Sequence, residues 1–253
     1  MKSATEPYFD GKLTMTQAAY LWSPPPVYSL PVRGSAARYP VQRIFCVGRN
    51  YHAHAAEMGV PVDKANSRPF YFTKSASTLV ASGATVPYPC GTANYQHEME
   101  LVVAIGGSGF RIAQSDAAGL IYGYAAGLDM TRRDLQLLAR EQGRPWDLGK
   151  DFESSSVCAE IVPNGQLGTP GVLDKGAITL AVNGQLRQSG DLAQLIWSIP
   201  ELLADLSKFY HLQPGDLIYT GTPEGVGALK SGDRITGSIE GVGDVALSIG
   251  EPE

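Results

Sequence analysis

The sequence predicts an α+β fold rich in β-strands, with a mixed, mostly antiparallel sheet and a few helices packed outside it. Three observations support this prediction. Short apolar runs bounded by glycine and proline outnumber the helical patterns. The pair Asn183-Gly184, inside the alternating stretch 178–190, is a strong hairpin signal. The strands are not spaced as regular βαβ units, which disfavours an all-parallel sheet.

The first half of the chain supplies the earliest strands. The apolar run 43–48 predicts a buried strand, and 50–59 predicts a short helix closed by Gly59. The aromatic run 68–75 and the apolar run 98–105 predict two further strands.

The next segment, 115–130, reads as a short helix followed by a strand that ends at Asp129. We expect residues 131–143 to form a helix capped by Thr131. On this helix the apolar residues share one face, which predicts the face that packs on the core; they are Leu135, Leu138 and Ala139.

The C-terminal third predicts one helix and several strands. Residues 198–216 contain an amphipathic helix with Pro200 in its first turn, where proline is tolerated. The stretch 216–250 is a string of short strands separated by glycine turns.

The length of 253 residues suits one main domain with a sizeable core. We expect residues 1–40 to be an N-terminal extension and residues 41–253 to be the main domain. The stretch 23–31, "SPPPVYSLP", is too rich in proline to be a helix or a central strand.

Composition excludes several kinds of partner. The net charge is −5 and no basic block occurs, so we expect neither nucleic acid nor a membrane surface as a partner. No apolar run is long enough to cross a bilayer, and the first residues lack the core of a signal peptide. The three widely spaced cysteines, Cys46, Cys90 and Cys158, predict free thiols and a cytoplasmic location.

Three acidic residues stand where strands begin or end. Glu98 and Glu100 point to the same side of a strand, and Asp129 ends another. Like charges at the mouth of a buried strand repel unless a cation lies between them. If the three converge they form a hard-oxygen site for Mg²⁺, Mn²⁺ or Ca²⁺. The alternative is a solvated strand edge with two exposed glutamates.

A second candidate lies in "GRNYHAHAAEMG", where His54 and Glu57 are neighbours on a helix at positions i and i+3. A carboxylate beside an imidazole fixes its tautomer and raises its basicity, as in a general base that activates water. The alternative is a surface helix on which both side chains face solvent.

Polar residues after Asp129 complete the candidate site. Arg133 and Gln136 share a helix face and would orient a carboxylate or carbonyl. Lys150 would stabilise an enolate or oxyanion, unless it is an ordinary loop lysine. In "YTGTPEGVG", Gly221 allows close backbone approach to a ligand and Thr222 offers a hydroxyl, although the stretch matches no nucleotide-binding fingerprint.

Together these stretches resemble the fumarylacetoacetate hydrolase family, and in particular its acylpyruvate-hydrolase branch. The segments that carry the resemblance span about residues 41–250: "CVGRNYHAHAAEMG", "HEMELVVAIG", "YGYAAGLDMTRRDLQ", "WDLGKDFESSSVCAEIVP", "VNGQLRQSGDLAQLIWSIPELLADLS" and "LQPGDLIYTGTPEGVGALKSGDRI". The resemblance implies a mixed β-sheet roll or sandwich with a few outer helices, a homodimer, and Mg²⁺ or Mn²⁺ as the cofactor.

By motif, the resemblance places Glu98, Glu100 and Asp129 on the metal ligands, and His54 with Glu57 on a water-activating pair carried by a lid. Arg133, Gln136, Lys150 and Thr222 match substrate-contact positions.

The implied reaction is hydrolytic carbon–carbon cleavage of a small anionic 2,4-dioxo acid in aromatic catabolism, with 3-fumarylpyruvate giving fumarate and pyruvate. Arg133 or Lys74 would hold the far carboxylate. Two alternatives stay open: oxaloacetate decarboxylation, tautomerisation or hydration on the same scaffold, and a non-catalytic ligand-binding module.

Overall fold

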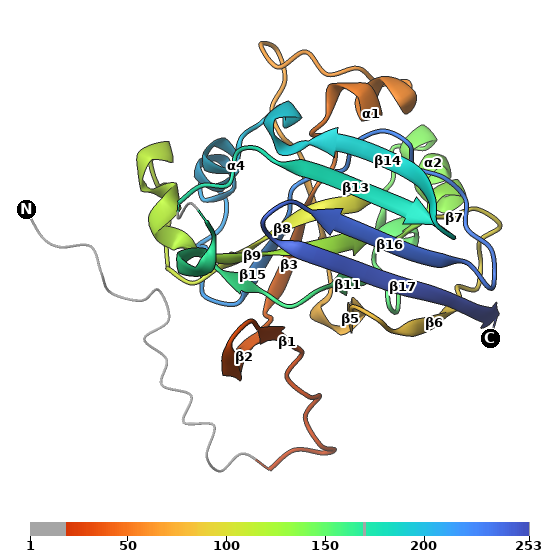
Figure 1. The fold of residues 1–253 in the computed structure, drawn as a ribbon, viewed down its shortest axis with the longest axis horizontal. Coiled ribbons are helices and arrows are strands. Elements are labelled where there is room, and N and C mark those ends of the chain that lie inside the picture. Colours follow the sequence, from red (N-terminus) through yellow and green to blue (C-terminus); the bar gives the residue numbers. More distant parts are fainter. Residues whose placement is uncertain (1–18, 169–170, 253) are drawn as a thin grey trace, which may run out of the picture.

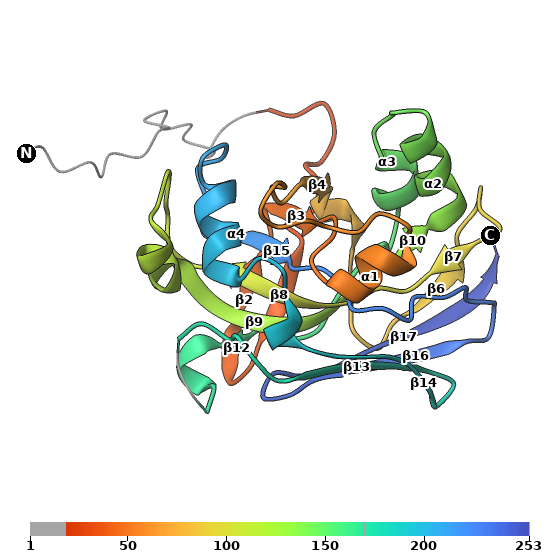
Figure 2. The ribbon, with the colours of Figure 1, turned by 90° about the horizontal axis from the view of Figure 1, so that it is seen from above.

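Two β-sheets packed face to face form the body of the protein. The computed structural model describes residues 19–168 and 171–252. Figure 1 looks onto the face of the smaller sheet, and Figure 2 shows that sheet along the lower side of the molecule, with β8 and β9 above it and α2 and α3 on the opposite side. The predicted strand-rich α+β fold with a mixed sheet is confirmed, because ten of the thirteen strand pairings are antiparallel and three are parallel.

The larger sheet has eight strands, seven of them in the order β4-β3-β15-β8-β9-β11-β5, with β12 paired to β9. Its strands are β3 (Arg43–Val47), β4 (Tyr71–Lys74), β5 (Leu79–Ala81), β8 (Met99–Ile105), β9 (Ile121–Asp129), β11 (Ser156–Cys158), β12 (Val162–Pro163) and β15 (Asp216–Tyr219). β8 and β9 are central and almost wholly buried, which agrees with their continuous apolar sequence.

The smaller sheet has five strands in the order β14-β13-β16-β17-β6. They are β6 (Thr85–Tyr88), β13 (Ala177–Val182), β14 (Gln185–Asp191), β16 (Arg234–Ile239) and β17 (Gly243–Pro252). Burial alternates along β13 and β16, as expected of strands with one solvated face. The predicted hairpin joins β13 to β14, and both Asn183 and Gly184 have positive φ, as its tight turn requires.

Two further pairs of strands lie outside these sheets: β1 (Ser29–Val32) with β2 (Ser35–Pro40), and β7 (Tyr95–Gln96) with β10 (Thr131–Arg132). The β1–β2 hairpin belongs to the expected N-terminal extension, of which residues 1–18 lie outside the described residues. Leu30, Val32 and Tyr39 of the hairpin are buried in a hydrophobic cluster with residues of the larger sheet.

The helices are short and connect the strands. The α-helices are α1 (His52–Glu57), α2 (Arg133–Glu141), α3 (Asp147–Lys150) and α4 (Ile199–Leu206), and the 3₁₀ helices are η1 (Ala76–Thr78), η2 (Gln114–Leu120), η3 (Asn164–Gln166) and η4 (Leu192–Gln194). α4 has the predicted proline in its first turn and a capping box between Ser198 and Glu201. Within the described residues, no helix is long and apolar enough to cross a membrane.

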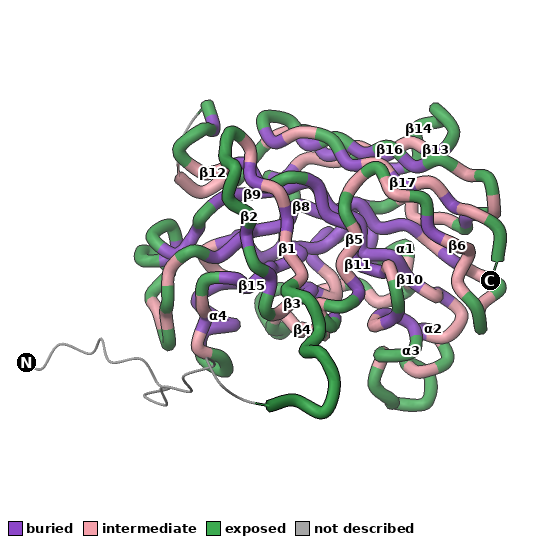
Figure 3. Tube along the Cα trace, turned by 90° about the horizontal axis from the view of Figure 1, so that it is seen from below, coloured by how far each residue is buried: buried purple, intermediate pink, exposed green. Residues whose placement is uncertain are grey.

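The core lies between the two sheets, where Figure 3 shows the buried segments concentrated. At one point the sheets approach so closely that only glycine fits. A Cβ at Gly237 of β16 would lie 2.4 Å from the sulfur of Met99 on β8. The smaller sheet therefore supports the first residue of the strand that carries Glu100.

The structure corrects two expectations about α2. The helix begins at Arg133, and Thr131 belongs to β10 instead of capping it. The apolar face is not the buried one: Leu138 is exposed, whereas Arg133 and Gln136 are buried. The reason is the position of the helix, which covers a polar cavity and turns its polar side inward.

Asn50 joins three segments beneath that cavity. Its side-chain Nδ2 donates to the carbonyls of Trp197 and Thr220, at 3.0 and 2.8 Å, and its Oδ1 accepts from Trp197 N–H at 2.7 Å. The residue is fully buried. These bonds fix the start of α1 against the end of β15 and the approach to α4.

Replacing Asn50 with alanine should lower the free energy of unfolding by about 3 kcal/mol or more, because three buried backbone groups lose their partner. Urea denaturation measures this change. Asn66→Ala, at an exposed position, is the matched control and should change stability by about 0.5 kcal/mol or less. A loss below about 1 kcal/mol for Asn50→Ala would contradict the joining role.

Candidate active site

A cavity of about 610 Å³ opens between the end of the larger sheet and the helices α1, α2 and α3. Its wall includes five of the residues that the sequence predicts for the site: His54, Glu98, Arg133, Gln136 and Lys150. Phe70, Phe72 and Trp146 supply an aromatic part of the wall. The cavity therefore combines charged groups with apolar surface, as small-molecule sites do.

Neighbouring antiparallel strands bring the three acidic side chains together. Glu98 directly precedes β8, Glu100 lies on β8, and Asp129 ends β9. Asp129 N–H donates to the carbonyl of Glu98 at 2.9 Å, which fixes the register at this edge. One carboxylate oxygen from each residue lies within 4.8 Å of the others, and all three side chains are buried. The expected convergence is therefore observed, and a solvated strand edge is not.

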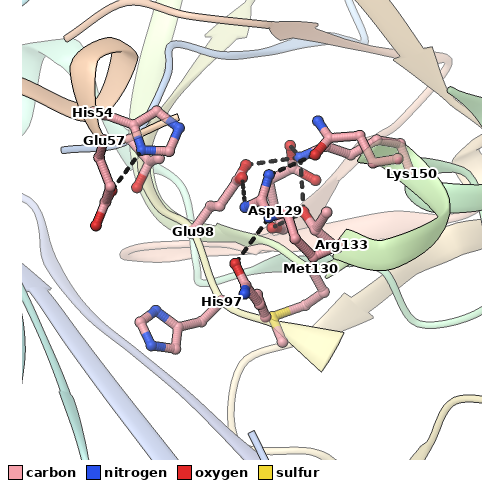
Figure 4. A network of polar contacts seen from close by, with 12 residues as sticks. His54, Glu57, His97, Glu98, Asp129, Met130, Arg133 and Lys150 are labelled. Atoms are coloured by element: carbon pink, nitrogen blue, oxygen red, sulfur yellow. Dashed lines mark hydrogen bonds and ion pairs between the residues drawn. The ribbon is translucent and has the colours of Figure 1, made fainter. Parts of the chain in front are cut away.

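Three cationic side chains of the chain itself surround these carboxylates. Lys150 Nζ donates to Glu98 Oε2, Asp129 Oδ2 and Thr131 Oγ1, each at 2.7 Å. Arg133 forms an ion pair with the other oxygen of Glu98. Lys74 Nζ lies 2.7 Å from Asp129 Oδ1. Figure 4 shows the resulting network around Glu98 and Asp129.

The charges act differently on the two glutamates. Burial opposes ionisation of Glu98, but Lys150 and Arg133 outweigh it and hold the pKa of this carboxyl well below its usual range. Burial raises the pKa of Glu100 well above its usual value, and the charges of Asp129 and Glu98 add to this effect. Within the described part of the chain, the Glu100 side chain accepts a single hydrogen bond, from Gly221 N–H at 2.7 Å.

These features fit a hard dication. Oxygen donors from three carboxylates are the ligands that Mg²⁺ and Mn²⁺ prefer. Asp129 Oδ1 is buried and has no hydrogen-bond partner among the described residues, since its contact with Lys74 lacks hydrogen-bond geometry. Glu100 is a buried acid with two acidic neighbours, and no cationic side chain of residues 19–168 or 171–252 forms an ion pair with it. A dication near Glu100 and Asp129 would offset this repulsion.

His54 lines the cavity from α1, and Glu57 on the same helix contacts its imidazole. His54 Nδ1 lies 3.2 Å from Glu57 Oε2, and the imidazole is only 4% exposed. Gly225 N–H donates to both oxygens of Glu57, at 3.1 and 3.3 Å, which connects α1 to the loop after β15. Because Nδ1–H donates to the carboxylate, the Nε2 atom of a neutral His54 is free to accept a proton.

Arg133 and Gln136 are arranged to present a hydrogen-bond donor to a ligand in the cavity. Arg133 Nη1 donates to Gln136 Oε1, and its Nε donates to Gln96 Oε1 at 2.8 Å. Since Gln136 accepts through its oxygen, its Nε2 is left as a donor, and no group in the described part of the chain accepts from it. Gln136 thus presents an amide N–H₂ group on the cavity wall.

The structure shows the contacts of four predicted residues, whose catalytic and substrate-binding roles stay predictions. Lys150 uses all three of its donors within the protein, on Glu98, Asp129 and Thr131. Lys74 is absent from the cavity wall and donates to the carbonyls of Met130 and Ser155. Gly221 and Thr222 are likewise absent from that wall.

Gly221 and Thr222 instead hold other parts of the site. Gly221 N–H binds Glu100, and its own φ of +103° is one that glycine adopts readily. Thr222 Oγ1 accepts a hydrogen bond from Gln188 Nε2. The other amide atom of Gln188, Oε1, accepts from Met99 N–H at 3.0 Å. Gln188 also binds His97, whose ring points away from the acidic cluster in Figure 4.

Sequence reasoning missed several residues of the cavity and its support. Gln188 stands in an ordinary hairpin pattern, and Asn50 carries no signal except its place in "GRNY". Arg49 and Arg140 line the cavity but were not selected. Arg140 lies two turns after Arg133 on α2, so the helical period was the signal that could have indicated it.

Fold and site together define a β-rich enzyme class in which buried carboxylates form a metal site beside a His–Glu pair. Residues 43–249 match the sequence model of one protein family, described as fumarylacetoacetate (FAA) hydrolase C-terminal. The chain belongs to the fumarylacetoacetate hydrolase family.

Individual members of the family show which enzymes this chain is similar to. Fumarylpyruvate hydrolase from Ralstonia sp is 61% identical over 196 residues, which are 78% of this chain and all of the relative. The crystal structure of fumarylpyruvate hydrolase from Pseudomonas aeruginosa, in complex with Mn²⁺ and pyruvate, matches with a TM-score of 0.87 and 46% identity over 92% of this chain and 100% of that one. Human mitochondrial oxaloacetate tautomerase FAHD1 is 37% identical, over 84% of this chain and 93% of that protein.

Glu100→Gln should weaken Mn²⁺ binding at least about tenfold, because it removes one charged oxygen donor while keeping the shape of the side chain. The same variant should melt at a higher temperature than the parent in the absence of metal, since glutamine removes the free-energy cost of burying an ionisable carboxyl, whose pKa is raised, beside two other acids. Calorimetric titration and thermal melting measure the two effects. Glu153→Gln, at an exposed position, is the control; equal Mn²⁺ affinity in Glu100→Gln and the parent would remove Glu100 from the ligand set.

Proposed function

We propose that this protein hydrolyses the carbon–carbon bond between the pyruvate part and the acyl part of a 2,4-dioxo acid. The proposed substrate is 3-fumarylpyruvate, and the products are fumarate and pyruvate. The observation that carries this proposal is that a three-carboxylate cluster and a His–Glu pair each place one side chain, Glu98 and His54, on the wall of the same cavity. The similarity to two fumarylpyruvate hydrolases supports the choice of substrate.

The residues that would hold Mg²⁺ or Mn²⁺ are Glu98, Glu100 and Asp129. When bound, the dication supplies a Lewis acid that favours negative charge on the oxygens of the pyruvate part. Lys150 and Arg133 keep Glu98 ionised and fixed in place, so the cluster is ready for binding. We assign Lys150 and Lys74 positioning roles on the basis of their contacts.

Water activation is the task of His54. Its Nε2 takes a proton from a water molecule while Nδ1–H stays bonded to Glu57. The water oxygen forms a bond to the carbonyl carbon of the acyl group while the carbonyl electron pair moves onto its oxygen, and Gln136 Nε2 donates a hydrogen bond to the substrate. That pair re-forms the carbonyl as the carbon–carbon bond breaks, and the electron pair of the broken bond enters the enolate of pyruvate. The proton held by His54 is returned to the enolate carbon, and the acid product loses its remaining proton to water to give fumarate.

Oxaloacetate chemistry is the second candidate function, because the tautomerases named above share more than a third of their residues with this chain. Tautomerisation moves a proton within the substrate and needs no attacking water, and decarboxylation likewise adds no water. Hydrolysis of an acylpyruvate, in contrast, places one oxygen atom from water in the acid product.

We also propose that the protein works as a homodimer in the cytoplasm, in the breakdown of aromatic compounds. Three free cysteines, of which Cys46 and Cys158 are buried, support a reducing compartment. The family resemblance supports the dimer, which light scattering on the purified protein would measure. The partner molecule is then a small anionic dioxo acid, not a nucleic acid or a membrane.

His54→Ala should lower kcat about 10²- to 10⁴-fold, because general-base assistance is lost, while Mn²⁺ binding is kept. Steady-state kinetics and titration with Mn²⁺ measure the two quantities. His52→Ala, on the exposed side of the same helix, is the matched control and should keep normal turnover. Near-normal turnover of His54→Ala would show that another group activates water.

Chelation by EDTA should abolish turnover of 3-fumarylpyruvate, and added Mg²⁺ or Mn²⁺ should restore it. In water enriched in ¹⁸O, mass spectrometry should find one labelled oxygen atom in fumarate. Unlabelled fumarate, or activity that resists chelation, would contradict the hydrolytic proposal. Turnover of oxaloacetate but of no acylpyruvate would favour the second candidate.

A further inference from the structure

Two of the four lysine and arginine side chains on the cavity wall form no ion pair with the acidic cluster. Lys150 and Arg133 are ion-paired there, whereas Arg49 and Arg140 form no salt bridge with any residue in the described part of the chain. A cation that lines a cavity without a carboxylate partner is the group that an anionic ligand would meet.

The two arginines contact the same short segment after α1. Arg140 Nη1 donates to the carbonyl of Met58 at 3.2 Å, and Arg49 Nη1 donates to that of Val60 at 3.4 Å. The guanidinium of Arg49 lies 4.9 Å from the centre of the Phe70 ring. Phe70 itself is held against the backbone at Gly48, where a Cβ would lie 2.0 Å from the ring. Arg49 therefore has a defined position at the cavity wall.

The electrostatic environment of this arginine pair favours an added negative charge. Arg49 Nε is buried and has no hydrogen-bond partner among the described residues. Partial burial lowers the pKa of Arg49, and the positive charge of Arg140 lowers it further. An anion beside the two guanidinium groups would offset their repulsion and provide acceptors for unused N–H donors.

The distance from the acidic cluster fits the length of the proposed substrate. Arg140 follows Arg133 by seven residues on α2, which corresponds to about 10 Å along the helix axis. Arg133 contacts Glu98, so Arg140 lies toward the other end of the cavity. In 3-fumarylpyruvate, the two carboxyl carbons are separated by roughly 7 Å when the chain is extended. The long arginine side chains can span the remainder.

We propose that Arg49 and Arg140 form an anion subsite that binds the carboxylate at the far end of the acyl group, and so select dicarboxylic over neutral acylpyruvates. The inference rests on the proposed function for the identity of the substrate. It replaces the expectation that Arg133 or Lys74 holds this carboxylate, since both are engaged by the acidic cluster.

The first test compares two substrates that share the reacting 2,4-dioxo acid and differ in the acyl group. 3-Fumarylpyruvate carries the far carboxylate, and acetylpyruvate ends in a methyl group. Arg140→Gln and Arg49→Gln should each lower kcat/KM for 3-fumarylpyruvate by about ten- to a hundredfold, mainly through KM. For acetylpyruvate the change should be about twofold or less. Arg144→Gln, in the exposed loop after α2, is the control and should affect neither substrate.

An equal loss on both substrates would overturn the subsite, because it would mean that the arginines act only by holding the segment after α1. Unchanged kinetics on 3-fumarylpyruvate in both variants would overturn it as well. In contrast, a parent protein that hydrolyses neither substrate would refute the proposed function and leave the subsite to be decided by binding alone.

The second test therefore uses no turnover. Calorimetry compares the binding of fumarate with that of crotonate, in which a methyl group replaces one carboxylate. The parent protein should bind fumarate at least about tenfold more tightly, and this preference should disappear in Arg49→Gln and Arg140→Gln. Equal affinity of the parent for fumarate and crotonate, or a preference retained in both variants, would overturn the subsite whatever the enzymatic activity.

Discussion

The structure depends on one electrostatic constraint: three carboxylates buried at the edge of the larger sheet must be balanced by positive charge. Lys150, Lys74 and Arg133 supply part of this balance, and each has a nearly inaccessible side chain in contact with a carboxylate. Ion pairs of this kind are costly to desolvate and do little for stability by themselves. Their presence is better explained by the need to hold the carboxylates in one place for a ligand.

Positive charge is distributed unevenly among the three carboxylates. Glu98 has two cationic partners and stays ionised, whereas Glu100, within the described residues, accepts from a backbone N–H and has two acidic neighbours but no ion pair. Positive charge is thus most needed near Glu100 and Asp129. The same reasoning applies with the sign reversed to Arg49 and Arg140, which influence each other electrostatically and form no salt bridge among the described residues.

The two-sheet fold provides the rigidity that this arrangement requires. β8 and β9 are neighbours in the middle of the larger sheet, so the backbone bond between Glu98 and Asp129 fixes two of the acids directly. Gln188 and Gly221 then tie the surrounding loops to β8 through buried hydrogen bonds, and Asn50 joins the segment before α1 to Thr220 at the end of β15. In contrast, α1 and the segment after it are held beside the cavity by a few side-chain contacts. Most of these contacts involve Glu57, Arg49 and Arg140.

Sequence by itself determined the strand-rich fold class, the hairpin at Asn183-Gly184 and the short helix or turn before Gly59, because side-chain alternation and turn chemistry are local. For Glu98, Glu100 and Asp129 the residues alone left a metal site and a solvated strand edge open, and the family resemblance favoured the metal site. Only the tertiary structure decided which face of α2 is buried and which cations meet which acids. Lys74, Lys150 and Arg133 come from three separate elements, and their distances to the carboxylates depend on how those elements pack. The apolar face of α2 misled the sequence reasoning because the helix covers a polar cavity, and amphipathic patterns assume an apolar one.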